Sequence, residues 1–347
     1  MTDRPTRGAL RDFLHAVGED LTLNARDNNQ VAFTVLVFMA AATLPFIDDG
    51  YLLSLGVDIT MYAVLATAWM LFSGPTNYIS LGSAAFFGIG MYTVGIGLGM
   101  LPFPALVALA GVLGGIFAAF VGLATLRISG IYFVIFTLGM AELIRQITVW
   151  GQAKMGSQAG IFVNHPMSSG ELYLLLLALL GAVIFIGWWI GRSRLGFALR
   201  IIGNDEVVAA HSGINTARAK VVLFVISTVF ASVTGALVAP RYSYVEPTLA
   251  FSAFISFQVV IMALLGGTTR LWGPLVGVIP FTLLLELINR INPRLSTLLL
   301  GVAFLLIVYV IPHGVVGLIE DVRSGRTTPA SIRGKLLGLL QRKGTHG

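Results

Sequence analysis

A polar segment, Gly191–Lys220, separates two apolar stretches and carries five Lys or Arg residues. Asn204 or Asp205 can cap a helix within it, and Glu206 would fall in the first turn, where the helix dipole favours an acid. Gly213 is the residue type that ends helices in a left-handed turn. The segment therefore predicts about two turns of helix lying along the cytoplasmic membrane surface, a shape suited to docking on a partner protein.

Ionisable residues inside the apolar stretches are few, and such residues usually form pairs or mark transport paths. Glu142 and Arg145 are three residues apart and can pair on one helix; the alternative is that Glu142 faces a transport path. Glu286 can pair with Arg290, four residues later. Asp58 has no partner of opposite charge within a helical turn.

The stretch from Asn77 to Tyr92 mixes hydroxyl groups, glycines and aromatic rings at membrane depth. A broken helix that lines a polar cavity needs this mixture, because its freed backbone groups require water or substrate. A helix packed among others would accept the same residues. Because the hydroxyls cluster with the glycines, we expect a cavity. The candidate path comprises Ser80, Ser83, Phe86, Phe87 and Tyr92, with Tyr132 and Glu142 on a later span.

The elements that carry these residues are apolar spans. Apolar residues form 56% of the 347-residue chain, charged residues form 11%, and the mean hydropathy is +0.87. These values indicate an all-α polytopic membrane protein. About ten runs approach the roughly 17 to 25 residues that cross a bilayer. They are Val31–Ile47, Tyr51–Phe72, Tyr78–Met100, Phe103–Thr125, Ile131–Trp150, Leu172–Ile190, Arg218–Ala239, Phe251–Gly266, Trp272–Asn289 and Leu295–Pro312, of which the third and eighth are the least regular.

Basic residues are distributed unequally between the two sides of these spans. With the N-terminus inside, 17 of the 22 Lys and Arg fall on the cytoplasmic side and four on the other. The positive-inside rule then places both termini in the cytoplasm. We expect a cytoplasmic tail over 1–30, a transmembrane domain over 31–312 that includes the polar segment 191–220, and a second cytoplasmic tail over 313–347. The net charge of +6 follows from this topology and requires no nucleic-acid partner.

The residue types argue against several classes of protein. The chain has no Cys, which excludes disulfides and iron–sulfur ligation. Its five His fall in tails, in loops or at the edge of a span, so paired haem ligands within the membrane are not expected. No phosphate-binding loop of the ATPase type occurs, so we expect no ATP hydrolysis by the chain itself. Two classes remain: a permease driven by a separate motor, and an ion-coupled secondary transporter that uses Asp58 and Glu286.

Four ordered motifs lie between about Leu52 and Ile319. They are Ile79-Ser-Leu-Gly-x-Ala-Ala-Phe-Phe-Gly-Ile-Gly-x-Tyr92, Leu126-Arg-x-x-Gly-Ile-Tyr-Phe133, Glu206-x-x-Ala-x-x-x-Gly-Ile-Asn215 and Leu264-Leu-Gly-Gly-x-x-x-Leu-Trp-Gly-Pro274. Together they resemble the permease subunits of branched-chain amino-acid ABC importers, in particular the longer of the two paralogous permeases.

The resemblance implies a type II ABC importer permease fold in a bacterial inner membrane. It implies a second, paralogous permease, two cytoplasmic ATPase subunits that bind ATP and Mg, and a periplasmic substrate-binding protein. The chain itself would be a non-catalytic translocation subunit without cofactor or metal. Coupling to the ATPase would fall on the helix of the polar segment, through Asn204, Asp205, Glu206, Ala209, Gly213 and Asn215.

The resemblance also bears on the substrate, which we expect to be a small amino acid, branched-chain or otherwise neutral. Two positions depart from the family pattern. Gly74–Tyr78 replaces a Gly-Tyr-x-Gly-Gln sequence, and Ser83 stands where His is frequent. The same family includes permeases for urea, short amides and aromatic acids, so these substrates remain alternatives.

Overall fold

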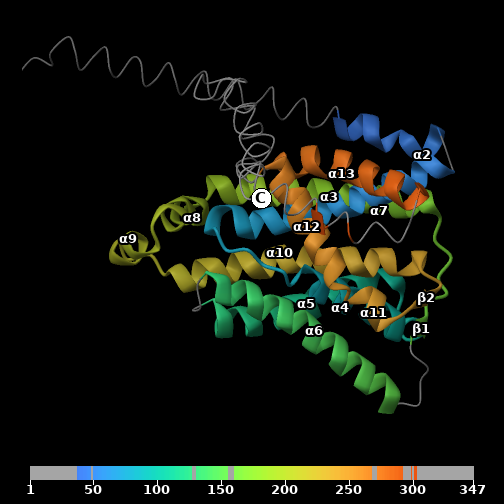
Figure 1. Cartoon of the computed structure of the whole chain (residues 1–347), viewed down its shortest axis with the longest axis horizontal. Helices are drawn as coiled ribbons and strands as arrows, with labels where there is room; N and C mark the ends of the chain where they lie inside the picture. Colours follow the sequence, from blue (N-terminus) through green and yellow to red (C-terminus); the bar gives the residue numbers. More distant parts are fainter. Residues whose placement is uncertain are drawn as a thin grey trace, which may run out of the picture.

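The computed structural model describes residues 37–47, 50–126, 130–154, 160–267 and 272–291, with 298 and 301–302. This part of the chain is almost entirely helical (Figure 1). Seven of its helices are long and apolar enough to cross a membrane, and two shorter apolar helices accompany them. The prediction of an all-α polytopic membrane protein is confirmed.

The spanning helices and the short elements alternate along the chain. The long helices are α3 (Tyr51–Thr76), α5 (Phe103–Thr125), α6 (Ile131–Lys154), α7 (Ser169–Arg192), α10 (Thr216–Val238) and α13 (Gly273–Ile291), with α11 (Pro247–Ala250) and α12 (Ala253–Gly266) forming the seventh span. The shorter elements are α2 (Leu44–Ile47), α4 (Ser83–Gly97), α8 (Arg194–Asn204), α9 (Glu206–His211) and η1 (Ala239–Arg241). Strands β1 (Ile161–Phe162) and β2 (Tyr244–Val245) pair antiparallel at the end of the bundle opposite α9 (Figure 1).

The apolar runs predict most of these spans. Phe103–Thr125 is helical over the predicted residues. The two runs expected to be irregular are interrupted: α4 covers only Ser83–Gly97, and α12 begins after the separate turn of α11. The first run is helical within its described part, 37–47, and the last, Leu295–Pro312, lies outside the described residues apart from three positions.

Local signals fix several helix ends. Helix α3 stops at Asn77, which adopts φ 57°, a left-handed conformation that a helix cannot continue. Helix α7 starts with a capping box: the Ser168 hydroxyl accepts from the Glu171 N–H at 3.1 Å, and the Glu171 carboxylate accepts from the Ser168 N–H at 3.1 Å. These ends set the length of the spans, because each cap satisfies backbone groups that a helix leaves free.

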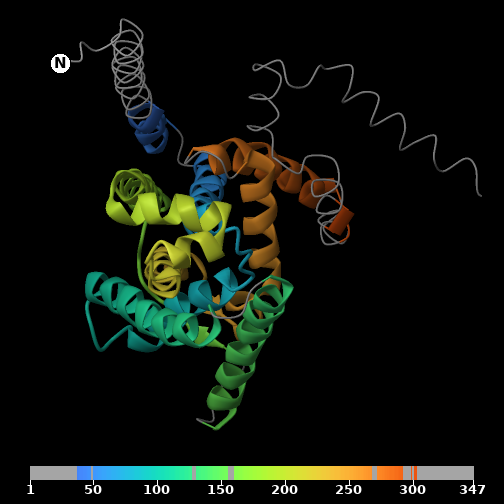
Figure 2. The same ribbon diagram turned by 90° about the vertical axis from the view of Figure 1, so that its left-hand side faces the viewer.

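Helix α10 lies at the centre of the bundle, packed against α3, α4 and α5 (Figures 1 and 2). Its backbone contacts that of α4 directly. A Cβ built on Gly90 would overlap the carbonyl oxygen of Ser232, and one built on Gly235 would overlap the carbonyl oxygen of Phe87. Only glycine permits this approach, which is typical of helix pairs in membranes.

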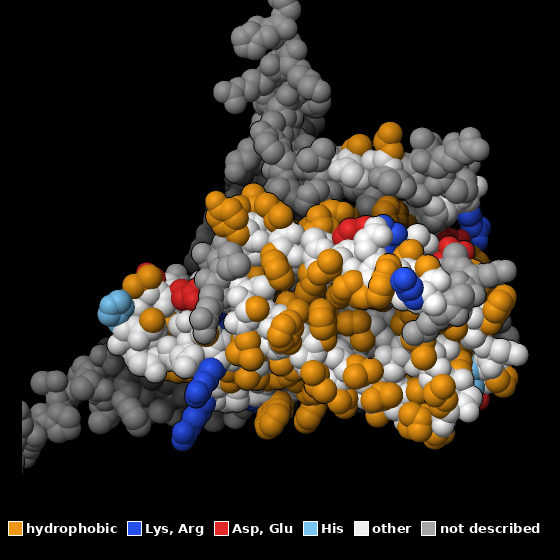
Figure 3. Space-filling view, turned by 90° about the horizontal axis from the view of Figure 1, so that it is seen from below, with side chains coloured by type: hydrophobic (Ala, Val, Ile, Leu, Met, Phe, Trp, Pro, Cys, Tyr) orange, Lys and Arg blue, Asp and Glu red, His pale blue; other side chains and the backbone are white. Residues whose placement is uncertain are grey.

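Helix α6 stands apart from this core (Figure 2). Only 22% of the residues in its most apolar 18-residue stretch are buried, whereas 78% are buried in the corresponding stretch of α3. Most of its exposed side chains are large and apolar, and these include Ile131, Ile135, Leu143, Ile147 and Trp150. The face of the molecule seen in Figure 3 is likewise dominated by hydrophobic side chains. Such a surface requires lipid or another apolar partner.

Replacing Gly90 tests the contact between α4 and α10. We expect Gly90→Ala to destabilise the folded protein by about 1 to 3 kcal/mol, because the new methyl group forces two backbones apart. The matched control is Gly139→Ala in α6, where an added Cβ meets nothing within 4 Å. The stability of both variants is measured by unfolding them with sodium dodecyl sulfate in mixed micelles while tryptophan fluorescence is recorded. Equal stability of the two variants would contradict the close contact.

Candidate functional site

The polar segment forms two short helices at one end of the bundle (Figure 1). Helix α8 begins at Ser193, whose hydroxyl accepts from the Gly196 N–H at 3.3 Å. Helix α9 begins at Asp205, whose carboxylate accepts from the Val207 and Val208 N–H groups at 2.8 and 3.2 Å. Of the two candidate caps, Asp205 is therefore the one that caps α9, and Asn204 is the last residue of α8.

The prediction of one helix of about two turns was incomplete. Helix α9 has six residues, and the eleven-residue α8 precedes it. The spacing of Leu199 and Ile202, both buried, explains the additional helix, because residues three apart lie on one helical face. Gly213 follows α9 with φ +79°, the left-handed conformation expected for it.

Helix α9 has a buried side and an exposed side. Ala209 is completely buried, and its carbonyl accepts from the Ile214 N–H at 3.1 Å, which closes the end of the helix. Val207 and Val208 are 64% and 53% exposed. Asn215 then starts α10, because its side chain accepts from the Arg218 N–H at 3.0 Å. Two large apolar side chains are thus presented at the tip of the segment.

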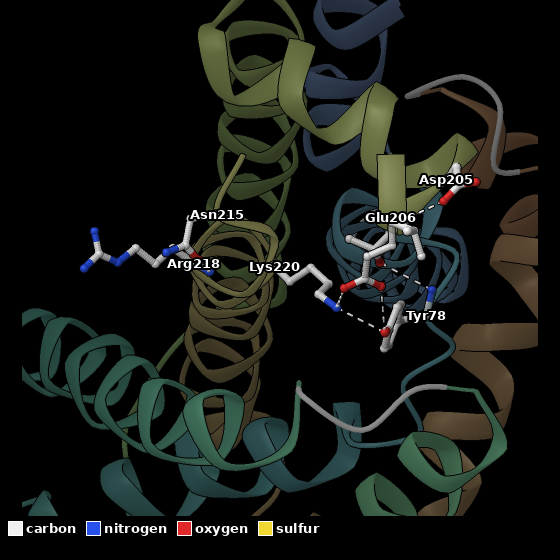
Figure 4. Close-up of polar contacts among 8 residues, drawn as sticks. Tyr78, Asp205, Glu206, Asn215, Arg218 and Lys220 are labelled. Carbon is white, nitrogen blue, oxygen red and sulfur yellow. Dashed lines mark hydrogen bonds and ion pairs between the residues drawn. The ribbon is translucent and has the colours of Figure 1, made fainter. Parts of the chain in front are cut away.

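Three side chains connect α9 to the rest of the bundle, and we call them the Lys220 cluster: Tyr78, Glu206 and Lys220 (Figure 4). The Lys220 ammonium donates to Glu206 Oε1 at 2.6 Å and to the Tyr78 hydroxyl at 3.0 Å. The Tyr78 hydroxyl donates to Glu206 Oε2 at 3.2 Å. The ammonium also lies 4.4 Å from the centre of the Tyr78 ring, within reach of a cation–π interaction.

The environment favours the ionised form of Glu206. Lys220 is only 2% exposed, although it was assigned to the polar segment; it belongs to α10 and points inward. Burial would raise the pKa of Glu206, but the hydrogen bond and charge of Lys220, with the Tyr78 hydroxyl, outweigh burial and lower that pKa below its ordinary value. Glu206 is therefore an ionised partner of a buried ammonium, besides its position in the first turn of α9.

A second contact joins the same two regions. The Asn77 side-chain amide donates to the carbonyl of Gly203, in the last turn of α8, at 2.9 Å. A Cβ on Gly203 would come within 2.6 Å of the Pro75 carbonyl oxygen, so the two chains run close together there. Asn77 and Tyr78 are consecutive. Both contacts therefore act on the short connection that leads from α3 into α4.

That connection, 77–82, is not helical, and side chains of other helices satisfy its backbone groups. The Trp69 indole of α3 donates to the Ser80 carbonyl at 2.7 Å. The Leu81 N–H donates to Thr137 Oγ1 of α6 at 3.0 Å. One turn further, the Ala84 N–H donates to Ser256 Oγ of α12 at 2.9 Å. Sequence reasoning missed these supporting residues, because no local motif marks them.

The candidate path residues on and before α4 lie inside the protein. Ser80, Ser83 and Phe86 line one cavity of about 10 Å³, room for about one water molecule. Phe87 and Tyr92 are buried, and the Tyr92 hydroxyl accepts from the Gln152 amide at 3.3 Å. The first three residues are thus brought together around one small space.

The other two path candidates lie on the exposed face of α6. Tyr132 is 70% exposed. Glu142 accepts from Arg145 Nε at 2.9 Å and from the Gln146 amide at 2.9 Å, which confirms the predicted local ion pair. The path candidates therefore fall into two groups, one within the bundle and one on its surface, and their role in transport stays a prediction.

The sequence is similar to that of known membrane transport proteins. Residues 51–308 match the family model described as "Branched-chain amino acid transport system / permease component". The chain is 27% identical to the high-affinity branched-chain amino acid transport system permease protein LivM of Escherichia coli (strain K12), over 89% of this chain and 81% of that protein. It is 26% identical to LivM of Salmonella typhimurium, over 86% of this chain and 79% of that protein.

A shorter match covers the permease protein LivH of E. coli (strain K12), 31% identical over 41% of this chain and 44% of LivH. No solved structure matches. The family model covers about three quarters of the chain, including the connection 77–82, α9 and the Lys220 cluster. The chain therefore belongs to the family of permease components of branched-chain amino acid transport systems.

Proposed function

We propose that this chain is the translocation subunit of an ATP-driven importer for a neutral, branched-chain amino acid, and that α9 couples it to the ATPase. The observation that carries the proposal is the Lys220 cluster. It connects a helix that projects from the bundle to the start of the broken span α4. The names of the LivM and LivH relatives favour this substrate class over urea, short amides and aromatic acids.

The geometry suits transmission of a displacement. The exposed Val207 and Val208 can insert into an apolar groove on an ATPase subunit, as the anchor residues of a docked helix do. Separating the pair would leave the buried Lys220 ammonium without its counterion, which is unfavourable even though the Glu206 side chain is 39% exposed and partly screened by solvent. A movement of α9 is therefore passed through Glu206 to Tyr78 and the connection 77–82, and not absorbed by a flexible loop.

The exposed surface of α6 supports one of the remaining partners, a second permease. A charged pair within a span is unfavourable against lipid and usually faces protein or water. A second, paralogous permease would cover this face, with the path running along Tyr132 and Glu142 between the two subunits. Two ATPases would bind ATP and Mg, and a periplasmic protein would deliver the amino acid. The chain itself would be non-catalytic and hold no cofactor, in a bacterial inner membrane with both termini in the cytoplasm.

The secondary-transporter alternative loses its main support. Its candidate proton carriers were Asp58 and Glu286. Asp58 is paired with Arg241 at 2.7 Å, and Glu286 is paired with Arg290 at 3.4 Å, as the sequence predicted for the second pair. Both carboxylates are thus engaged by guanidinium groups, so neither is the unpartnered acid that a proton-coupled carrier requires.

Neutralising Lys220 tests the coupling. In the complete complex with binding protein, we expect Lys220→Met to reduce amino-acid uptake about tenfold and to abolish the stimulation of ATP hydrolysis by loaded binding protein, an effect of ordinary size for coupling between sites. The matched control is Arg218→Met, which removes a positive charge from the same turn of α10 but points away from the cluster (Figure 4). Normal uptake and stimulated hydrolysis in Lys220→Met would refute the proposed coupling route.

The pH dependence of stability offers a separate test. Because the pKa of Glu206 is lowered on folding, its contribution to stability is present above the ordinary carboxylate pKa and is lost as the pH falls through the lowered value. We expect wild type to melt at a higher temperature than Glu206→Gln at pH 7, and the gap to narrow below about pH 4.5. Thermal unfolding in detergent at a series of pH values measures this difference in melting temperature. A gap that widens with acid would exclude the stabilising ion pair.

A further inference from the structure

A second ion pair occupies the end of the bundle opposite the Lys220 cluster. The Arg241 guanidinium donates to Asp58 Oδ1 at 2.7 Å and to Asp58 Oδ2 at 3.1 Å, a bidentate contact across 183 positions of sequence. A third hydrogen bond, 3.0 Å long, runs to the Ser54 hydroxyl. The side chains of Arg241 and Asp58 remain 28% and 36% exposed, so a small molecule can reach both charges.

This site is separate from the coupling site. Arg241 is the last residue of η1, the short helix that continues α10, whereas Lys220 lies in the first turns of α10. At 1.5 Å per residue, about 30 Å separates them along the helix axis. Asp58 lies two turns inside α3, about 10 Å from the start of that helix. In the proposed orientation, the pair is therefore at the periplasmic side and somewhat below the ends of the helices.

The surroundings balance the charge. Glu286 of α13 lies close enough to Asp58 to act on it electrostatically, and Arg290 pairs with Glu286 at 3.4 Å. The Arg290 guanidinium also lies 4.3 Å from the centre of the Tyr51 ring. Two acids and two guanidinium groups thus give a local net charge of zero. A ligand that carries one positive and one negative charge leaves this balance unchanged.

We propose that the Asp58–Arg241 pair is a binding site for the zwitterionic head of an α-amino acid on its way into the path. The carboxylate of the ligand takes the place of Asp58 on the Arg241 guanidinium, and the ammonium group binds the freed Asp58 carboxylate. This inference rests on the proposed function, which supplies the amino acid, and it extends that function by naming a recognition site in the permease itself.

Two physical arguments support the exchange. The bidentate geometry that Arg241 uses for Asp58 is the geometry in which guanidinium groups bind any carboxylate. Each charge also has a partner before and after the exchange, so no charge is left alone in a partly desolvated place. A ligand with a single charge would leave Asp58 or Arg241 unpaired in a partly desolvated place, which is unfavourable although solvent screens part of the cost. The site therefore selects for both charges together.

The absence of Cys makes the site directly testable. Leu55 is half-buried and lies on the same face of α3 as Asp58, so Leu55→Cys places a thiol beside the pair. The complete complex, without nucleotide and in phosphatidylcholine nanodiscs, is labelled with a membrane-impermeant thiol reagent. We expect millimolar leucine to slow labelling several-fold. Isovalerate and isopentylamine, which each lack one charge, should have no effect.

Two variants act as controls. Met100→Cys, on an exposed residue beyond α4, should label at the same rate with and without leucine. Asp58→Asn in the Leu55→Cys chain should remove the protection by leucine. If that variant fails to assemble on size exclusion, the comparison of leucine with its two singly charged analogues decides the question alone.

The outcomes separate the site from the proposed function. Leucine uptake by the Leu55→Cys complex without protection of the thiol would overturn the site and leave the importer intact. Protection in a complex that does not take up leucine would support the site and count against the importer. Phosphatidylethanolamine carries the same two charges; protection by bilayers of that lipid, with none by leucine, would assign the pair to lipid headgroups and overturn the proposal.

Discussion

The direct contact between the backbones of α4 and α10 is the constraint on which the other features depend. Without side chains at Gly90 and Gly235, the two helices approach until their carbonyl oxygens and Cα atoms touch. Helix α10 is thereby held on three sides, by α3, α4 and α5. A helix packed so closely transmits displacement along its axis, because close-packed interiors deform little. Both ion pairs that connect distant parts of the chain, at Lys220 and at Arg241, lie at the ends of this one helix and its extension.

The interrupted start of α4 shows how such a bundle can contain a movable part. Backbone groups freed from a helix are expensive within a membrane unless they find partners. Here the partners are the side chains of Trp69, Thr137 and Ser256, which come from three different helices. A shift of the connection 77–82 must therefore exchange hydrogen bonds with α3 and α6, and a shift that extends into the first turn of α4 must also exchange the one between Ala84 and α12. In the proposed coupling, a movement of α9 would in this way become a rearrangement of several spans.

Features that depend on neighbouring residues could be predicted from the sequence. Hydropathy predicts the spans, the pair of Glu142 with Arg145 follows from helical spacing, and the left-handed turn at Gly213 follows from its residue type. The pairs Glu206–Lys220 and Asp58–Arg241 could not be predicted, because their partners are 14 and 183 positions apart and meet only through packing. Lys220 belongs both to the predicted polar segment 191–220 and to the predicted span Arg218–Ala239, so the sequence leaves its surroundings open. A charge beside an apolar run usually lies in water, whereas this one is buried and pairs with a carboxylate that is 39% exposed.

The exposed face of α6 has a consequence for the supply of subunits in the cell. Helix α6 is the least buried of the seven spans, and it carries an ion pair on its open side. A copy made without a second permease would keep these charges against lipid, whereas assembly would remove them from it. In the proposed assembly, each permease would stabilise the other by mass action, so the folded population of either would depend on the concentration of its partner. Copies synthesised in excess would be the ones that membrane proteases remove, and matched synthesis of the two chains becomes a requirement set by one helix.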